Sequence, residues 1–381
     1  MSGRPSLAVT LCRDPRDFAR LRPEWDALQR RCATATPFQN HSWLDSWWLS
    51  YGSAGKLRIV LVRRDGQLVA AAPLMLVHRP MPLLVSLGGP ISDYGDILVE
   101  DAHAGCAIAA LARGLQRAAR LAVIDLREVR PGAAAERLYE TWTGARARLT
   151  DSVCLELPAA PMDELVKRLS TSRAQRVRAK LRKIDALNIE DYRVLEHEVP
   201  GAVDRLLRLH ELQWRGRGVT VEHIRPRFAA HLKRATRRMV RDGDAALTEY
   251  RLDGEVVAVN VALLSGHLTG GYLYGAHPEL RDKKVDVATM LLRHDANHAA
   301  STGRRVVSLL RGKESYKNHW RPEAVTNQRL LMAPAALEPA LRLHAARSDW
   351  RDRAAGAVNS RFPEARVWRD RLKDLRATAS R

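Results

Sequence analysis

Cysteine is scarce in this sequence. Among 381 residues there are four cysteines, and no two of them form a C-x-x-C spacing. A disulfide framework or a cysteine-based metal site depends on recurrent, closely spaced cysteines, so the pattern argues against both. We expect reduced thiols in the core of a cytosolic protein. The four residues concerned are Cys12, Cys32, Cys106 and Cys154.

Long apolar runs are also lacking. The longest run, LVAAAPLMLV at 68–77, is interrupted by Pro73, and a membrane-spanning helix needs about 18 or more apolar residues. The first residues, MSGRPSLAVT, do not contain the apolar segment of a signal peptide. We therefore expect a cytoplasmic protein and interpret 68–77 as a strand.

Acidic residues are outnumbered by basic ones. The 63 Lys and Arg residues against 43 Asp and Glu give a formal net charge of +20. This charge attracts anions such as nucleotide cofactors, phosphorylated glycans, nucleic acids and acidic membrane surfaces. The sequence has no helix-turn-helix pattern, zinc-ligand spacing or RNP-type aromatic run, which argues against a nucleic-acid-binding module.

The second half of the sequence alternates between helix and strand patterns. Helical stretches at 200–216 and 223–242 precede the strand-like run AALTEYRL. The dipeptide Asp253-Gly254 then joins it to EVVAVNVALL, a strong signal for a tight hairpin. The run HLTGGYLYG, a helix at 286–301, and the strands RVVSLL and TNQRLLMA follow.

The first half repeats this order. Helical stretches at 15–32 and 41–51 precede two strands joined by Asp65-Gly66, and more strands surround a helix at 103–119. With 46% apolar residues, the chain can bury a core in each half. The fold class predicted from the repeated order is α/β (α+β), with two related domains, each a mixed central sheet flanked by helices.

Four segments are expected from these patterns. The first domain covers 1–160, a basic helical connector covers 161–185, the second domain covers 186–335, and a basic helical tail covers 336–381. The connector carries an apolar stripe and a basic stripe at helical spacing. The apolar stripe is Ala174, Val177, Leu181 and Ile184, and the basic stripe is Arg173, Arg176, Lys180 and Lys183.

The stretch GKESYKNHW at 312–320 follows the apolar strand VVSLL. Ligand sites in α/β sheets lie beyond strand ends, so we interpret this polar cluster as part of a site. Gly312 allows close approach of the backbone. We expect Tyr316 and Lys317 to project into a cleft and Trp320 to anchor the turn. No comparable cluster follows AVIDLREV in the first half, which predicts that the first domain is a degenerate scaffold.

The order of elements and several quoted stretches resemble the GNAT acyltransferases. The tandem arrangement is similar to that of FemAB-like transferases. Several stretches resemble sequences of the CelD/BcsL (BioF2-like) acetyltransferase family: PFQNHSWLDSWWLSYG, ISDYGDILV, STSRAQRVRAKLRKI, LHELQWRGRG, GGYLYGAHPE and LLRHDANHAASTGRRVVSLLRGKESYKNHW. The resemblance covers roughly residues 35–335. It implies tandem GNAT-like domains and an acyltransferase of polysaccharide or cell-envelope metabolism that uses acetyl-CoA or another acyl-CoA, without a metal.

The resemblance also locates a phosphate-binding loop. GNAT proteins bind the CoA pyrophosphate on a glycine-rich loop that opens a helix, where backbone N–H groups hold the phosphates. Here the equivalent stretch reads RDKKVDVAT at 281–289, with Asp286 in place of a glycine. An Asp at a helix start is a natural cap and would repel a phosphate. The cofactor-binding residues implied are Lys283, Lys284, Ala288 and Thr289.

Direct acyl transfer needs a base for the nucleophile, an acid for the thiolate and donors for the oxyanion. We predict Tyr316 as the acid, and His210 or Asp286 as a base, with a helix cap as the alternative role for Asp286. The predicted substrate-binding residues are Gly312, Lys313, Lys317, Trp214, Arg215, Tyr274, Asp93, Tyr94, Arg173 and Arg176.

Two other functions remain open. Transfer of an aminoacyl group from charged tRNA, as in FemAB-like relatives, suits the positive charge and the missing glycine loop. A non-catalytic module that binds anions or nucleic acid suits the basic connector. The expected partners are an acyl-CoA, an anionic or glycan-type small acceptor and, at the periphery, an acidic membrane surface. Nucleic acid enters only as tRNA in the first alternative or in the binding-module alternative.

Overall fold

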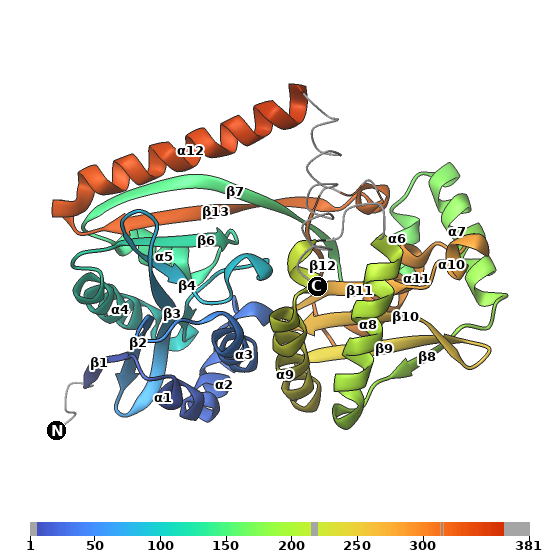
Figure 1. Ribbon diagram of the computed structural model, residues 1–381, viewed down its shortest axis with the longest axis horizontal. Coiled ribbons are helices and arrows are strands. Elements are labelled where there is room, and N and C mark those ends of the chain that lie inside the picture. The colour runs from blue at the N-terminus through green and yellow to red at the C-terminus, as the bar shows by residue number, and fades with distance from the viewer. Residues whose placement is uncertain (1–5, 215–219, 313, 315, 362–381) are drawn as a thin grey trace. The chain divides into compact units, whose positions relative to one another are not determined.

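The computed structural model describes residues 6–214, 220–312, 314 and 316–361 (Figure 1). The chain divides into two compact units. Unit 1 combines the described residues up to Cys154 with Val325–Arg353, and unit 2 is built mainly from Leu155–Ala324. Each unit has a mixed sheet flanked by helices, so the predicted α/β fold with two related domains is confirmed.

Unit 1 contains one mixed sheet in the order β1-β2-β3-β4-β6-β13-β7, with the short β5 paired to β3. Its elements, in chain order, are β1 (Leu7–Cys12), α1 (Pro15–Arg20), α2 (Arg22–Arg30), α3 (His41–Tyr51), β2 (Leu57–Arg64), β3 (Gln67–His78), β4 (Pro82–Ser86), β5 (Leu98–Val99), α4 (Ala104–Ala118), β6 (Val123–Val129), α5 (Ala134–Thr141), the larger part of β7 (Ala145–Pro158), β13 (Glu323–Ala333) and most of α12 (Glu338–Arg361).

Unit 2 has the order β12-β11-β10-β9-β8, with the last residues of β7 beside β12. Its elements are α6 (Met162–Lys167), α7 (Thr171–Asp185), β8 (Glu190–Arg193), α8 (Val199–Trp214), the 3-10 turn η5 (Val221–Ile224), α9 (Pro226–Asp242), β9 (Ala245–Leu252), β10 (Glu255–Leu264), β11 (Leu268–Ala276), α10 (Glu279–Asp282), α11 (Val287–Ser301), β12 (Val306–Arg311) and the 3-10 turn η6 (Lys317–Trp320).

Both units use the same hairpin. Asp65 and Gly66 join β2 to β3 with φ angles of 49° and 85°, and Asp253 and Gly254 join β9 to β10 with 52° and 83°. Positive φ at both central residues matches the right-handed twist of the strands, so the dipeptide fixes the strand register.

In each unit a helix connects the two strands of a parallel pair, α4 in unit 1 and α11 in unit 2. β4 pairs with β6 in unit 1, and β11 pairs with β12 in unit 2. The second strand of each pair carries a non-glycine residue in the left-handed region, Glu128 with φ 56° and Leu310 with φ 56°. The repeat therefore extends from the order of elements to the backbone of single residues.

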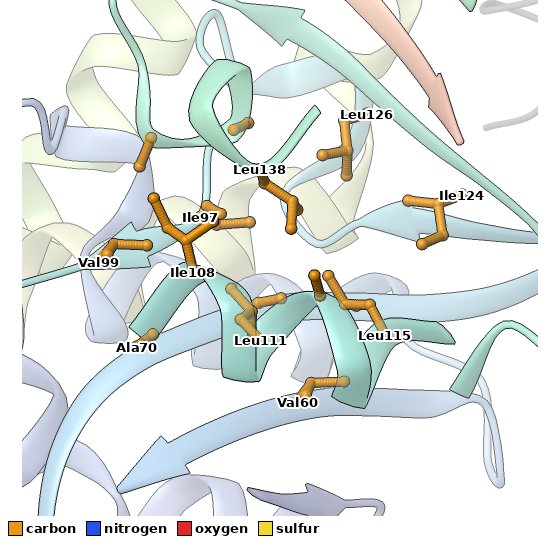
Figure 2. Packing of buried hydrophobic residues seen from close by; sticks show 14 of the residues in the cluster. Val60, Ala70, Ile97, Val99, Ile108, Leu111, Leu115, Ile124, Leu126 and Leu138 are labelled. Carbon is orange, nitrogen blue, oxygen red and sulfur yellow. The ribbon is translucent and has the colours of Figure 1, made fainter. Parts of the chain in front are cut away.

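Separate cores hold the two units. In unit 1, Ile108, Leu111 and Leu115 of α4 pack against side chains of the sheet such as Val60 and Ile124 (Figure 2). The cysteine prediction needs a correction, because Cys106 is exposed at the start of α4 and Cys12 is only half-buried. The helical spacing from Ala107 to Leu111 places the apolar face of α4 inward and leaves Cys106 outside.

In unit 2, α7 buries one stripe of its surface. Ala174, Val177, Leu181 and Ile184 are all buried, and the first three share a cluster with Leu292 and other residues of α11 and β12. The segment predicted as a connector is thus packed into unit 2. β13, predicted as the last strand of the second domain, lies between β6 and β7 of unit 1.

Candidate active site

The parallel strands β11 and β12 separate beyond their first paired residues. Their register ends with Gly270 opposite Ser308, although β11 continues to Ala276 and β12 to Arg311. Leu310, with φ 56°, redirects β12 at this point. Beyond Gly270 the main chain of β11 therefore lacks this parallel neighbour, although α8 contacts part of it: the carbonyl of Tyr274 accepts from His210 and the N–H of Ala276 donates to Gln213.

Lys317 holds the turn that follows β12. It is 5% exposed, and its Nζ donates to the carbonyl of Arg311 at 2.8 Å and lies 2.9 Å from the carboxylate of Glu314. The Glu314 carboxylate lies directly against Gly312, where a side chain would collide with it. The sequence predicted Lys317 in an open cleft; the structure places its amine inside the turn, because a buried ammonium group needs partners.

Tyr274 of β11 and Tyr316 of the turn lie in one neighbourhood. Burial raises the pKa of Tyr316, and nearby Tyr274 and Glu314 raise it further. Burial also raises the pKa of Tyr274, against a lowering hydrogen bond from Gln213. Both phenols keep their protons at neutral pH, so they can donate hydrogen bonds to developing negative charge.

His210 of α8 lies in a chain of hydrogen bonds. Its Nδ1 lies 2.7 Å from the carbonyl oxygen of Tyr274, which can only accept, so Nδ1 carries the proton. Its Nε2 then accepts from Nδ1 of His223 at 3.1 Å. Burial lowers the pKa of His210 against the bond to Tyr274, and burial together with His210 lowers the pKa of His223 to about 4. The N–H and the ring-nitrogen lone pair of His210 are therefore both engaged, which leaves the predicted base occupied.

Asp286 caps α11. One of its oxygens accepts from the backbone N–H of Thr289 at 3.1 Å, and the other pairs with Lys180 of α7. The structure shows Asp286 as the helix cap, the alternative role that the sequence left open. Lys283 pairs with Glu279 at 3.4 Å, within its own short helix.

The remaining residues of the predicted cofactor loop lie around this cap. Lys284 is exposed with φ 54°. Ala288 is half-buried in the first turn of α11, and the side chain of Thr289 is buried. The first N–H groups of any helix lack intrahelical acceptors, and here the carboxylate of Asp286 takes the one at Thr289.

Arg173 and Arg176 are exposed on α7, on the side opposite its buried stripe. Within the described parts of unit 2, neither residue forms an ion pair with an acidic side chain. Lys180, one turn further along, is the member of this stripe that reaches Asp286. The stripe thus leads along α7 to the start of α11.

Asp93 and Tyr94 belong to unit 1 and are not part of this cluster. Tyr94 is buried against Phe38, and the carbonyl of Asp93 accepts from Asn327 at 3.2 Å. The next residue, Gly95, donates its N–H to the carbonyl of Glu128 at the end of β6. In unit 1 the chain itself therefore covers the strand end that is open in unit 2.

Three predicted residues have limited placement. Lys313 and Arg215 lie outside the described residues. Trp214, the last residue of α8, is half-buried and lies at 6.2 Å, ring centre to ring centre, from His210.

The sequence missed several residues of this neighbourhood. Glu314, Gln213 and His223 each contact a predicted residue. Glu314 lies in the stretch 312–320 that the sequence singled out but was given no role there, and the other two stand at no spacing that marks them. His223 follows His210 by 13 residues and lies in the turn η5, so helical periodicity does not relate them.

Neither a metal site nor a membrane-spanning helix is found among the described residues. In the part of the chain that the structure describes, no three His, Cys, Asp or Glu side chains gather in a way that would hold a metal ion. Likewise, none of the described helices combines the length and apolar character that crossing a bilayer requires.

Residues 171–318 match the protein family described as acetyltransferase (GNAT) domain. This segment lies within unit 2 and includes α7, the separating strands and the turn at Tyr316. Unit 2 therefore contains a segment that matches the GNAT acetyltransferase domain family. Among curated proteins, a sequence search finds no match.

Solved structures with a similar fold extend over both units. FemX is 13% identical, with 84% of this chain and 98% of that chain covered and a TM-score of 0.62. A conserved protein of unknown function from Bacteroides thetaiotaomicron is 11% identical (86% and 100% covered, TM-score 0.57). L-PGS from Bacillus licheniformis is 10% identical (86% and 96% covered, TM-score 0.52). At these identities the likeness concerns the fold.

Proposed function

We propose that unit 2 transfers an acyl group from an acyl-CoA thioester to an amine or hydroxyl acceptor. The main support for this proposal is the gap between β11 and β12 beyond Gly270 and Ser308, which lies within the segment that matches the acetyltransferase family. An extended pantetheine arm can enter this gap and lie along β11, as a strand would.

Tyr316 has the properties of a donor to the leaving sulfur. Because its pKa is raised, the phenol is a weak acid but remains protonated, and it can stabilise the thiolate as the C–S bond breaks. Tyr274 can support the same charge from β11. We assign the acceptor to the amine- or hydroxyl-bearing compounds of polysaccharide or cell-envelope metabolism, on the resemblance to the CelD/BcsL family.

A second donor is favoured by the start of α11. Asp286, already paired with Lys180, occupies the place where the resemblance expects a phosphate-binding glycine. A carboxylate there weakens a pyrophosphate site, and the exposed cations of α7 suit a longer polyanion. An aminoacyl-tRNA, the donor of the FemAB-like proteins that the chain resembles, fits this observation.

The two donors can be separated by binding and turnover. We expect coenzyme A to raise the melting temperature of the full-length protein, and acetyl-CoA with glucosamine as a probe acceptor to release free thiol. Stabilisation by charged tRNA alone, with no effect of coenzyme A, would instead assign the second donor. Absence of both responses would leave the binding-module function.

A substitution at Tyr316 tests its role as a hydrogen-bond donor. Tyr316→Phe should lower kcat about 10²-fold with little change in melting temperature, because it removes one donor to the developing charge. Tyr139→Phe, a substitution in unit 1, is the matched control and should leave turnover unchanged. Full activity of Tyr316→Phe would remove this residue from the mechanism.

A further inference from the structure

A carboxyl group lies buried beside the gap between the strands. Asp295 of α11 is 7% exposed, and its two oxygens accept from Nδ2 of Asn260 at 2.9 and 3.2 Å. Burial raises the pKa of Asp295 to about 7, against the hydrogen bond from Asn260 that lowers it. Near neutral pH the group can therefore both take up and release a proton.

Gly271 lies directly over this carboxyl. A Cβ placed on Gly271 would stand 3.2 Å from Oδ2 of Asp295, so a residue without a side chain lets the main chain of β11 lie this close to the carboxylate. Gly271 is itself exposed and is the first residue of β11 beyond Gly270, where pairing with β12 ends. The buried carboxylate therefore lies against the main chain of β11 at the point where the pairing with β12 ends.

A bulge in β11 brings Tyr274 to the same face. Between Val261 opposite Leu273 and Ala262 opposite Gly271, the strand has one extra residue, Tyr272. A bulge of this kind shifts the alternation of side chains. Tyr274 lies opposite Asn260, whose side chain contacts Asp295, so Tyr274 also faces α11.

The titratable groups that face Asp295 are few. Across β9, the phenol of Tyr250 is close enough for its pKa to be raised by burial and then by Asp295. His294, the neighbour of Asp295 in α11, is directed elsewhere: its Nε2 lies 3.2 Å from Thr248, and its Nδ1 lies 3.4 Å from Asp191. No cation among the described residues forms an ion pair with Asp295, which leaves the carboxylate free to act as a base.

Resting on the acyl transfer proposed above, we propose that Asp295 is the general base that takes the proton of the acceptor. The acceptor nitrogen or oxygen attacks the thioester carbon over Gly271. As the new C–N or C–O bond forms, the N–H or O–H proton passes to the carboxylate of Asp295. The C–S bond breaks and its electron pair leaves with the sulfur, which Tyr316 stabilises. Asp295 then returns the proton to water.

Two variants test this base. Asp295→Asn keeps the size and the contact with Asn260 but cannot accept a proton, so kcat/KM for acetyl-CoA and glucosamine should fall about 10²-fold or more. For the wild type, kcat/KM expressed per unprotonated glucosamine amine should fall tenfold per pH unit below about pH 7, and Asp295→Asn should lose this dependence. Gly271→Ala covers the carboxylate without removing it and should lower kcat while the protein stays folded.

Controls distinguish the possible failures. Gly266→Ala, in the turn before β11 with nothing within 4 Å of the added methyl, should behave as wild type. If Asp295→Asn keeps wild-type turnover and its pH dependence, Asp295 is not the base, although acyl transfer stands. If the wild type neither binds coenzyme A nor releases thiol, the proposed function fails and takes the base with it. If Asp295→Asn does not fold, Gly271→Ala with full activity would still overturn the proposal.

Discussion

Gly312 shows how one residue fixes the turn at the candidate site. Its φ of 123° lies in a region that residues with a side chain rarely adopt, and the carboxylate of Glu314 occupies the space where a Cβ would stand. We expect Gly312→Ala to lower the free energy of unfolding by about 1–3 kcal/mol, the range for a strained backbone conformation. Urea unfolding at neutral pH measures this change.

A paired substitution separates strain from collision. In Gly312→Ala/Glu314→Ala the carboxylate is gone, so the part of the loss that comes from collision should return and the part from the backbone should remain. Gly266→Ala serves as the matched glycine control. A Gly312→Ala protein as stable as the wild type would show that the turn does not need the left-handed conformation.

At the scale of single residues, the sequence predicted where some site residues lie along the chain but not which way their side chains point. The motif around Tyr316 and its position beyond a strand could be found, because polar residues after an apolar strand are visible in the sequence. The inward direction of Lys317 could not, because it follows from the path of the turn, which offers a carbonyl and a carboxylate to the amine. Asp295 stood unnoticed in a helix pattern, since burial and the missing side chain of Gly271 are properties of the packed fold.

At the scale of elements, two histidines connect α8, η5 and β11. His223 donates to His210, and His210 donates to the main chain of Tyr274. Burial lowers both pKa values, that of His223 from 6.5 to about 4, so the folded protein binds these protons less readily than the unfolded chain. This contribution to stability is complete above about pH 6.5 and is lost as the pH falls towards 4.

Replacing His223 should reduce this acid sensitivity. In His223→Gln the amide can still donate to His210 but does not titrate. Between pH 6.5 and 4, the unfolding free energy of the wild type should therefore fall by up to roughly 3 kcal/mol more than that of His223→Gln, since each tenfold change in proton affinity is worth about 1.4 kcal/mol. Urea unfolding at pH 4.5 and 7 measures the difference. An equal loss in both proteins would contradict the buried, neutral pair.

Elements with a strong apolar pattern were predictable and the others were not. The stripe of α7 and both Asp-Gly hairpins appear in the structure where the sequence placed them. The strands β1 and β8 were missed. β8, Glu190–Arg193, has no buried residue, so it carries none of the apolar alternation that marks a strand.

For the whole molecule, the two units are not two consecutive segments of the sequence, because the chain returns to unit 1 after forming unit 2. Leu330 and Met332 of β13 are buried in the core of unit 1, although β13 follows unit 2 in the sequence. Periodicity predicts that a strand exists, but its partner some 200 residues away depends on packing. A linear division at about residue 160 therefore could not reveal that unit 1 is completed by the last strand.

Arg329 provides the test of this completion. It is 8% exposed, and its guanidinium donates two hydrogen bonds, of 2.7 and 2.6 Å, to Asp125 of β6. Burial by itself raises the pKa of Asp125, but the bonds from Arg329 and His344 outweigh it and lower the pKa. Asp125 is thus a buried anion whose charge is balanced by a residue from the far end of the chain.

Arg329→Met in the full-length protein should therefore lower the unfolding free energy of unit 1 by about 3–5 kcal/mol, because it removes both guanidinium hydrogen bonds from a buried carboxylate and leaves it with His344 alone. Amide hydrogen exchange should show the loss of protection in β6 and β13. Arg342→Met removes a cation that pairs with Glu338 on the surface of α12, 2.5 Å apart, and should cost less than about 1 kcal/mol. Protection in β6 that survives Arg329→Met unchanged would mean that unit 1 does not depend on the strand supplied after unit 2.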